Sequence, residues 1–197
     1  MTLRAVVLAA GESRRLGEPK ALAQLGARTA LEQLLSALER VDPEPLVVTG
    51  AHDAEIRARL GTRARCLFHP RWMEGRTTSV LAARIALPEA DVLIAPVDVP
   101  LVAAATVEAL ASAWRESGSP ARGWLAPRLG AQGGFGHPIV VGRELLARLE
   151  PGKELRTLRA LAQPLLALET NDPAILDDLD TPADLAALRR RLEFGTG

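Results

Sequence analysis

The sequence predicts an α/β fold in three layers, with helices on both faces of a mostly parallel central sheet. Short runs rich in Val, Leu and Ile alternate with segments whose apolar residues recur at a spacing near 3.6, which is the pattern of strands joined by crossover helices. The runs are apolar at successive positions, as in parallel strands covered on both faces. At 197 residues the chain has the length of one such domain, so we expect residues 1–197 to form a single domain.

Five segments have the composition of buried strands. In chain order they are residues 4–10, 45–50, 64–69, 90–97 and 137–141. The one cysteine of the chain, Cys66, lies in the third segment. We expect it to act as a small apolar filler of the core.

Helical spacing fills most of the remaining chain. The expected helices are residues 29–40, 53–60, 77–87, 104–117, 142–150, 153–162 and 181–194. The first has the sequence of a capping box, with Thr29 as N-cap and Glu32 three residues later. The last begins with Thr181 as N-cap and Pro182 at its first position. Residues 117–137 contain six glycines and two prolines, so we expect a long loop or a small excursion beside the sheet there.

Composition and charge favour a small-molecule partner. The chain has 24 Lys and Arg against 24 Asp and Glu, and its pI is about 6.9. This balance indicates neither a nucleic acid nor an anionic membrane surface as a partner. Since no membrane span and no signal-peptide pattern is evident in the sequence, we expect a cytoplasmic protein.

The loop after the first strand has the composition of a phosphate-binding site. Residues 8–20, "LAAGESRRLGEPK", lie at the carboxyl edge where open α/β sheets bind ligands. We expect Gly11 and Gly17 to allow positive φ and close backbone approach, while Arg14, Arg15 and Lys20 supply the positive charge that a triphosphate requires. The chain uses lysine only twice, which makes Lys20 conspicuous. The spacing matches neither the P-loop nor the GxGxxG pattern, so another type of nucleotide loop is indicated.

Two carboxylates are the candidate metal ligands. Asp98 follows the strand 90–97, so its side chain would lie at the same sheet edge as Gly11. Asp180 precedes the N-cap Thr181 and is free to turn toward a metal. Hard oxygen ligands, completed by phosphate and water, suit Mg²⁺. The alternative for Asp98 is an ordinary turn residue.

The histidines are not spaced as a metal triad. His52, His69 and His137 each stand alone in the sequence, so structural or substrate-edge roles are expected. His137 begins a strand beside the glycine-rich segment, and we expect it to contact a second substrate. Arg14 is expected to face solvent.

The segment "LAAGESRRLGEPK" resembles the opening signature of nucleotidyltransferases with a type-A glycosyltransferase-like fold, and most closely that of the molybdenum cofactor nucleotidyltransferases. The resemblance continues, in the family's order, at "HPRWMEGRTTSV", "PVDVPL", "GFGHPIVV" and "LDTPADL". It implies a Rossmann-like nucleotidyltransferase fold and transfer of a nucleoside monophosphate to a second substrate, with release of pyrophosphate and with Mg²⁺ as helper. Such transfer builds negative charge on phosphate oxygens, which a metal and fixed cations stabilise.

This resemblance, together with the loop, assigns the candidate site residues. The catalytic candidates are Lys20, Arg15 and Asp98. The metal candidates are Asp98 and Asp180. The candidates for binding the nucleotide and the second substrate are Leu8, Ala9, Ala10, Gly11, Ser13, Arg15, Lys20, Ser79 and His137.

The leading interpretation is a cytidylyltransferase that uses CTP and a molybdopterin-type or other small phosphorylated acceptor. Cytidylyl members of the family resemble this chain at residues 8–13, whereas guanylyl members tend to have Gly at the position of Ala10. The chain departs from the family at "RTTSV", residues 76–80, where Gly-Ser-Ser-Leu is common, and at Val99, where a polar or long residue is usual. Two alternatives stay open. One is transfer to a sugar phosphate or small alcohol phosphate, and the other is a catalytically silent nucleotide-binding module.

Overall fold

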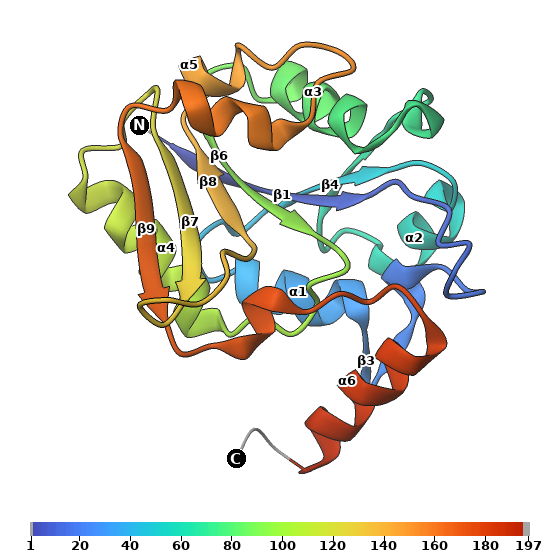
Figure 1. The fold of residues 1–197 in the computed structure, drawn as a ribbon. Helices are drawn as coiled ribbons and strands as arrows, with labels where there is room; N and C mark the ends of the chain where they lie inside the picture. Colours follow the sequence, from blue (N-terminus) through green and yellow to red (C-terminus); the bar gives the residue numbers. More distant parts are fainter. Residues whose placement is uncertain (1, 195–197) are drawn as a thin grey trace.

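The central sheet of the computed structural model, which describes residues 2–194, has seven strands in the order β5-β4-β1-β6-β8-β7-β9 (Figure 1). The strands are β1 Leu3–Ala9, β4 Leu46–Thr49, β5 Arg65–Phe68, β6 Asp91–Pro96, β7 Trp124–Leu129, β8 Ile139–Val141 and β9 Leu165–Thr170. β8 runs antiparallel to both of its neighbours, and the other neighbouring pairs are parallel. The predicted mostly parallel sheet is therefore confirmed.

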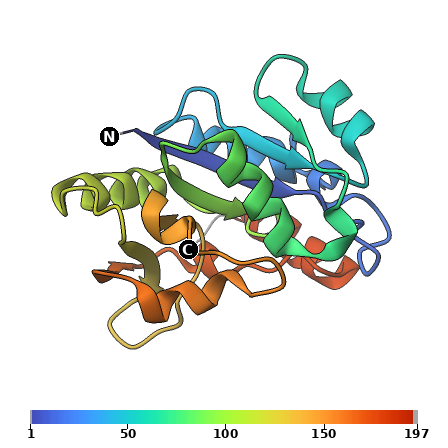
Figure 2. The same ribbon diagram turned by 90° about the horizontal axis from the view of Figure 1, so that it is seen from above.

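Helices cover both faces of this sheet. They are α1 Ala30–Leu38, α2 Asp53–Leu60, α3 Arg76–Ala86, α4 Ala104–Glu116, α5 Arg143–Leu146 and α6 Pro182–Phe194, with 3-10 segments η1 Lys20–Leu22, η2 Trp72–Glu74, η3 Leu155–Leu161 and η4 Pro173–Leu176. Seen from above, α3 and the orange segment that holds α5 and η3 lie over the sheet (Figure 2). In Figure 1, α1 and α4 lie on the opposite face.

The buried side chains divide between these two faces. Val7 of β1 belongs to the core cluster of α1 and α4, while its neighbour Val6 belongs to the cluster of α3, α5 and η3. Successive residues of a strand point to opposite faces, so β1 is apolar on both sides because both sides are covered. The three-layer prediction is confirmed.

A third cluster holds the loop after β1 and the last helix in place. The strands β2 Gln24–Leu25 and β3 Arg28–Thr29 form a two-stranded ribbon. Leu25 of this ribbon packs with Leu16 of the loop and with Leu185 and Leu188 of α6. The start of α6, which follows Asp180, is thereby placed beside the loop.

The two predicted helix starts are confirmed. Glu32 Oε2 accepts a hydrogen bond from Thr29 N at 2.7 Å, and Thr29 Oγ1 accepts one from Glu32 N at 3.3 Å, as a capping box requires. At α6, Asp184 Oδ2 accepts from Thr181 N at 2.7 Å, and Thr181 Oγ1 accepts from Asp184 N at 3.3 Å.

The prediction of a loop or an excursion beside the sheet over residues 117–137 is wrong in its centre. Residues Trp124–Leu129 form β7, which lies inside the sheet between β8 and β9. The glycines stand before and after this strand rather than within it. A high glycine content of the whole segment therefore did not exclude a strand at its centre.

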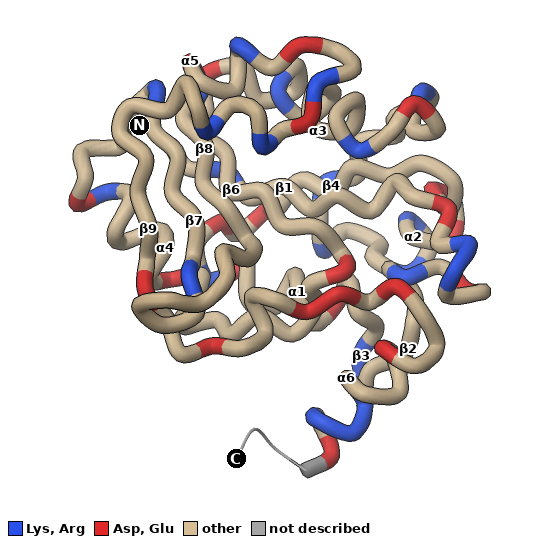
Figure 3. The backbone as a smooth tube through the Cα atoms, in the orientation of Figure 1, with Lys and Arg blue, Asp and Glu red and all other residues tan. Residues whose placement is uncertain are grey.

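No strand was predicted at β9, an edge strand whose residues alternate between exposed and half-buried. The expected helix 142–150 shortens to α5, and the expected helix 153–162 is the 3-10 segment η3. Acidic and basic segments are interspersed along the chain (Figure 3). Among the described residues, no helix has the length and apolar character needed to cross a membrane.

Candidate functional site

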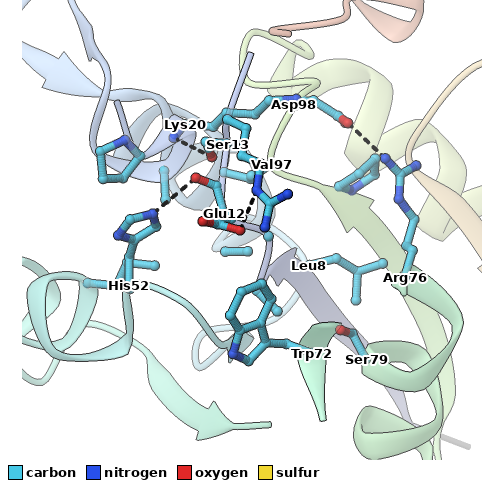
Figure 4. Close-up of a pocket in the computed structure, with 18 of the residues that line it drawn as sticks. Leu8, Glu12, Ser13, Lys20, His52, Trp72, Arg76, Ser79, Val97 and Asp98 are labelled. Carbon is cyan, nitrogen blue, oxygen red and sulfur yellow. Dashed lines mark hydrogen bonds and ion pairs between the residues drawn. The ribbon is translucent and has the colours of Figure 1, made fainter. Parts of the chain in front are cut away.

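A cavity of about 520 Å³ opens at the carboxyl ends of β1 and β6 (Figure 4). We call it the first cavity. All but one of the predicted site residues line it, namely Leu8, Ala9, Ala10, Gly11, Ser13, Arg15, Lys20, Ser79, Asp98 and Asp180. The exception is His137. The topology therefore brings together residues from the two ends of the chain at the sheet edge where ligands bind in open α/β folds.

The loop from β1 is shaped by its own hydrogen bonds and by one apolar anchor. Ser13 Oγ accepts a hydrogen bond from Lys20 N at 3.0 Å, and Leu16 is buried in the third cluster. Positive φ occurs at Ser13 (59°) and at Gly17 (82°). Gly11 does not adopt positive φ, so that part of the prediction is wrong. A Cβ added to Gly11 would meet no protein atom within 4 Å, and the space beside it in the cavity is open to a ligand.

Asp180 pairs with two of the three cations of the loop. One of its carboxylate oxygens is paired with Lys20 Nζ and the other with Arg15. Burial raises the pKa of Asp180, but the hydrogen bonds and charges of Lys20 and Arg15 outweigh burial, and the pKa is lowered overall. The side chain of Lys20 is 14% exposed and that of Arg15 is 72% exposed. Lys20 is therefore held inside the cavity, while Arg15 lies at its rim.

Asp98 has a cation partner as well. Arg76, the first residue of α3, approaches Asp98 Oδ2 with its guanidinium at 3.0 Å (Figure 4). A third carboxyl group, that of Asp178, lies close enough to Asp180 and Asp98 for their charges to act on it. Burial raises the pKa of Asp178, and the negative charges of Asp180 and Asp98 raise it further. In the sequence, Arg76 stands out only as a departure from the family, and Asp178 was not among the predicted site residues.

The two candidate metal ligands fit a Mg²⁺ site that is completed from outside the protein. Among residues 2–194, no three His, Cys, Asp or Glu side chains are grouped as a metal site. Asp98 and Asp180 both line the first cavity, and Mg²⁺ typically takes one or two carboxylates together with phosphate and water. The donor set suits an ion that arrives with a nucleotide.

Several further residues line the first cavity without having been predicted. Trp72 comes from η2, and Gly50 leaves room for it, since a Cβ on Gly50 would lie 2.6 Å from the Trp72 side chain. His52 Nε2 lies 3.3 Å from the carbonyl oxygen of Glu12 (Figure 4). Arg14 pairs with Glu12 and has a side chain that is 80% exposed, at the rim of the cavity.

His137 lines a second cavity of about 440 Å³. This cavity lies between α3, β7, β8 and η3, and it shares Arg76 with the first cavity. Burial lowers the pKa of His137, which favours its neutral imidazole. The other two histidines lie elsewhere. His52 lines the first cavity, and buried His69 lies with Nε2 2.9 Å from Thr78 Oγ1.

A known protein family matches most of the chain. The family model described as "MobA-like NTP transferase domain" matches residues 5–170. This range contains the loop after β1, Asp98 and His137, and it ends before Asp180.

Solved structures of similar fold include two that span nearly the same length. Rv0371c from Mycobacterium tuberculosis is 27% identical, with a TM-score of 0.78 over 96% of this chain and 98% of that one. A nucleotidyl transferase from Methanothermobacter is 25% identical, with a TM-score of 0.79 over 98% and 99%. Another structure of Rv0371c is a complex with manganese.

A further solved structure shares the fold at lower sequence identity, and curated sequences match part of the chain. The molybdopterin-guanine dinucleotide biosynthesis protein A of Archaeoglobus fulgidus is 16% identical, with a TM-score of 0.72 over 98% of this chain and 100% of that one. Among curated sequences, the bifunctional protein GlmU of Francisella tularensis is 34% identical over 113 residues, which are 56% of this chain. The matched region is 25% of GlmU, so the chain spans about a quarter of the curated relatives it matches.

Proposed function

Since the chain belongs to the MobA-like NTP transferase domain family, we propose that it transfers CMP from CTP to a molybdopterin-type acceptor and releases pyrophosphate. The observation that carries the proposal is that Lys20, Arg15 and Asp98 line one cavity with Asp180. Fixed cations and carboxylates at a single sheet edge are what transfer of a charged phosphoryl group requires.

In the proposed reaction, an oxygen of the acceptor's phosphate attacks the α-phosphorus of CTP. The bond from this phosphorus to the oxygen bridging it to the β-phosphorus breaks, and pyrophosphate leaves with the electron pair. A phosphate oxygen is already an anion at neutral pH, so the nucleophile needs no general base. The work of the protein is to hold the two anions together and to stabilise the charge of the leaving group.

Lys20 and Arg15 are placed for the phosphates of the nucleotide. Each is paired with Asp180 across the loop, and a triphosphate can replace Asp180 as their partner. Asp98 and Asp180 would hold Mg²⁺, which when bound supplies further charge stabilisation at the phosphates. Every cation and carboxylate would then keep an oppositely charged partner after the exchange.

The preference for CTP rests on Ala10. This residue lies directly after β1 and lines the first cavity. Its methyl group narrows the space at the end of the strand relative to glycine, which favours a pyrimidine over a larger purine.

Release of pyrophosphate tests the proposal. The protein is mixed with CTP, GTP, UTP or ATP, each with Mg²⁺ or Mn²⁺ and each with molybdopterin, with a sugar phosphate or with no acceptor, and we expect release with CTP and molybdopterin. Release with GTP instead would overturn the base preference, and release with a sugar phosphate would overturn the acceptor. A protein that binds nucleotides but turns over none of these mixtures would be a silent nucleotide-binding module.

A further inference from the structure

We propose that Arg76 is a displaceable counter-ion of Asp98, which occupies this carboxylate in the free chain and leaves it when a divalent cation arrives together with a nucleotide. This role rests on the proposed function, because it takes Asp98 to be a ligand of the metal. It adds that the free chain binds the metal weakly, and that the metal and the nucleotide strengthen each other's binding.

The contact between Arg76 and Asp98 occupies a carboxylate that lines the first cavity. Arg76 Nη2 donates to Asp98 Oδ2 at 3.0 Å (Figure 4), and the side chain of Asp98 is only 13% exposed. A guanidinium at this distance offsets much of the negative charge of the carboxylate and fills space beside Oδ2. The guanidinium and a metal ion therefore compete for the same oxygen.

The guanidinium can leave Asp98 without a change of the backbone. Arg76 is the first residue of α3, and the hydroxyl of Thr77 ties this end of the helix to the carbonyl oxygen of Lys153 at 2.8 Å. The hydroxyl of Thr78 donates to the carbonyl oxygen of Gly75, also at 2.8 Å. In contrast, the side chain of Arg76 is 61% exposed and lines both cavities. The start of α3 is thus fixed, while the charged end of Arg76 has open space beside it.

The helix itself does not favour an arginine at this position. The first turn of a helix carries partial positive charge, which favours Asp or Glu and disfavours Arg. Arg76 also belongs to residues 76–80, where the chain departs from the common pattern of the family. The arginine is therefore explained by its contact with Asp98 rather than by the stability of α3.

The other candidate metal ligand is occupied in the same way. Asp180 pairs with Lys20 and Arg15. A divalent cation that binds alone would have to separate these pairs and would add its charge beside three protein cations. A nucleoside triphosphate brings the negative charge that the displaced cations need. The metal should therefore bind tightly only with the nucleotide, and by linkage the nucleotide should bind more tightly with the metal.

Binding of Mn²⁺ to the free chain tests this role without any turnover. The dissociation constant of Mn²⁺ is measured for the full chain without nucleotide, from the electron paramagnetic resonance signal of unbound Mn²⁺. The variants are Arg76→Met and Arg76→Gln, which remove the charge, and Arg76→Lys, which keeps it. Arg71→Met is the matched control, because Arg71 is 69% exposed and pairs with Glu74 at 2.6 Å outside the first cavity.

Both neutral variants should bind Mn²⁺ about 5- to 10-fold more tightly than the original chain, the scale of removing one positive charge beside the ion. Arg76→Lys and Arg71→Met should keep an affinity close to the original one. In a chain that carries Asp98→Asn, Arg76→Met should give no such gain, because the carboxylate that it would free is absent. Damage to the site would weaken metal binding, so a gain distinguishes a counter-ion from a structural residue.

The coupling to the nucleotide is measured with CTP. Its dissociation constant is determined without metal, in the presence of EDTA, and with saturating Mn²⁺. Mn²⁺ should tighten the binding of CTP. The ratio of the two constants should be smaller in Arg76→Met than in the original chain, because the variant has no pair at Asp98 to separate.

Three results would overturn this role of Arg76: unchanged or weaker Mn²⁺ binding in both neutral variants, an equal gain in Arg71→Met or in the Asp98→Asn chain, and an unchanged ratio for CTP. If Arg76→Met tightens Mn²⁺ binding while no mixture of nucleotide and acceptor releases pyrophosphate, the proposed function fails and the counter-ion stands. If CTP and molybdopterin release pyrophosphate while the neutral variants bind Mn²⁺ like the original chain, only the counter-ion fails.

Discussion

Two sets of ion pairs in this molecule are built from the same groups but stand in different surroundings. In the first cavity, Asp180 pairs with Lys20 and Arg15. Between α1 and α2, Glu32 pairs with Arg59 at 2.8 Å. The two carboxylate side chains are about equally exposed, at 16% for Asp180 and 14% for Glu32, so burial does not distinguish them.

What distinguishes the two sets is the space beside them. The pair of α1 and α2 lies on packed helices, and Glu32 also caps the first turn of α1. Its carboxylate accepts from Arg59 and Thr29, and despite burial its pKa falls from 4.5 to about 2. The pairs of the first cavity border an open volume, where a ligand can take the place of either partner. We therefore expect the cavity pairs to act in turnover and the helix pair to act in stability.

The largest effect is expected from Asp98→Asn. The substitution keeps the shape of the side chain and removes the charge proposed to act on the metal, so turnover should fall about 10³-fold, since a metal contributes several kcal/mol at the transition state. Pyrophosphate release and thermal melting are measured together, with Glu116→Gln, at an exposed position of α4, as control. Loss of folding in parallel with turnover would remove the distinction between the two sets of pairs.

Lys20→Ala should lower turnover about 10²-fold, the effect of losing one charged partner of the transition state. The chain provides its own control in Lys153→Ala, its other lysine, which is exposed. Steady-state kinetics with CTP and Mg²⁺ measure the effect. If both variants retain the kinetics of the original chain, the loop after β1 does not bind phosphates.

Ala10→Gly separates the effect of shape from the effect of charge in the first cavity. It removes a methyl group from the cavity lining and leaves the charged residues unaltered. The original chain should favour CTP over GTP about tenfold to a few hundredfold in kcat/KM, as expected from one steric or hydrogen-bond difference. The variant should reduce that ratio, whereas Ala131→Gly in an exposed turn should not. Equal affinity for all four nucleotides in the original chain, or tighter binding of GTP, would contradict the assignment of CTP.

The smallest effect is expected from Glu32→Ala, and it should be an effect on stability rather than on turnover. It should lower the free energy of unfolding by about 1 kcal/mol at pH 7, by removing charged hydrogen bonds to Thr29 and Arg59, with turnover unchanged. Because the folded pKa of about 2 lies below the ordinary 4.5, this contribution is present above pH 4.5 and is lost as the pH falls toward 2. Denaturation across that range should show the two chains converging, with Glu89→Ala as control. A constant difference would mean that the charge of Glu32 is not what stabilises α1.

The half of the sheet that holds the first cavity was predictable from local patterns. β1, β4, β5 and β6 were each predicted as strands from a short apolar run, and the loop after β1 was predicted because its glycines and cations lie within one stretch of sequence. Asp98 was predicted to lie at the same sheet edge because it directly follows β6. Its pairing with Arg76 was not predictable, since that contact depends on where α3 begins.

In the other half of the sheet, only β8 was predicted as a strand, within the apolar segment 137–141. The glycines around residues 124–129 indicated a loop, although they only border β7. β9 begins with the short apolar run Leu165–Leu168, but no strand was predicted there, and the strand lies half-exposed at the sheet edge. The second cavity combines residues of α3, β7, β8 and η3. It becomes visible only when these elements are packed together.

The pairing of Lys20 with Asp180 joins residues 160 positions apart in the chain. Contacts of such separation form late, because the entropy of closing the intervening chain must be offset by other contacts first. The loop after β1 can be made early in synthesis, yet it acquires its counter-charge only when the start of α6 docks against Leu16 and Leu25. The paired state of Lys20 therefore reports that nearly the whole polypeptide has reached its final arrangement.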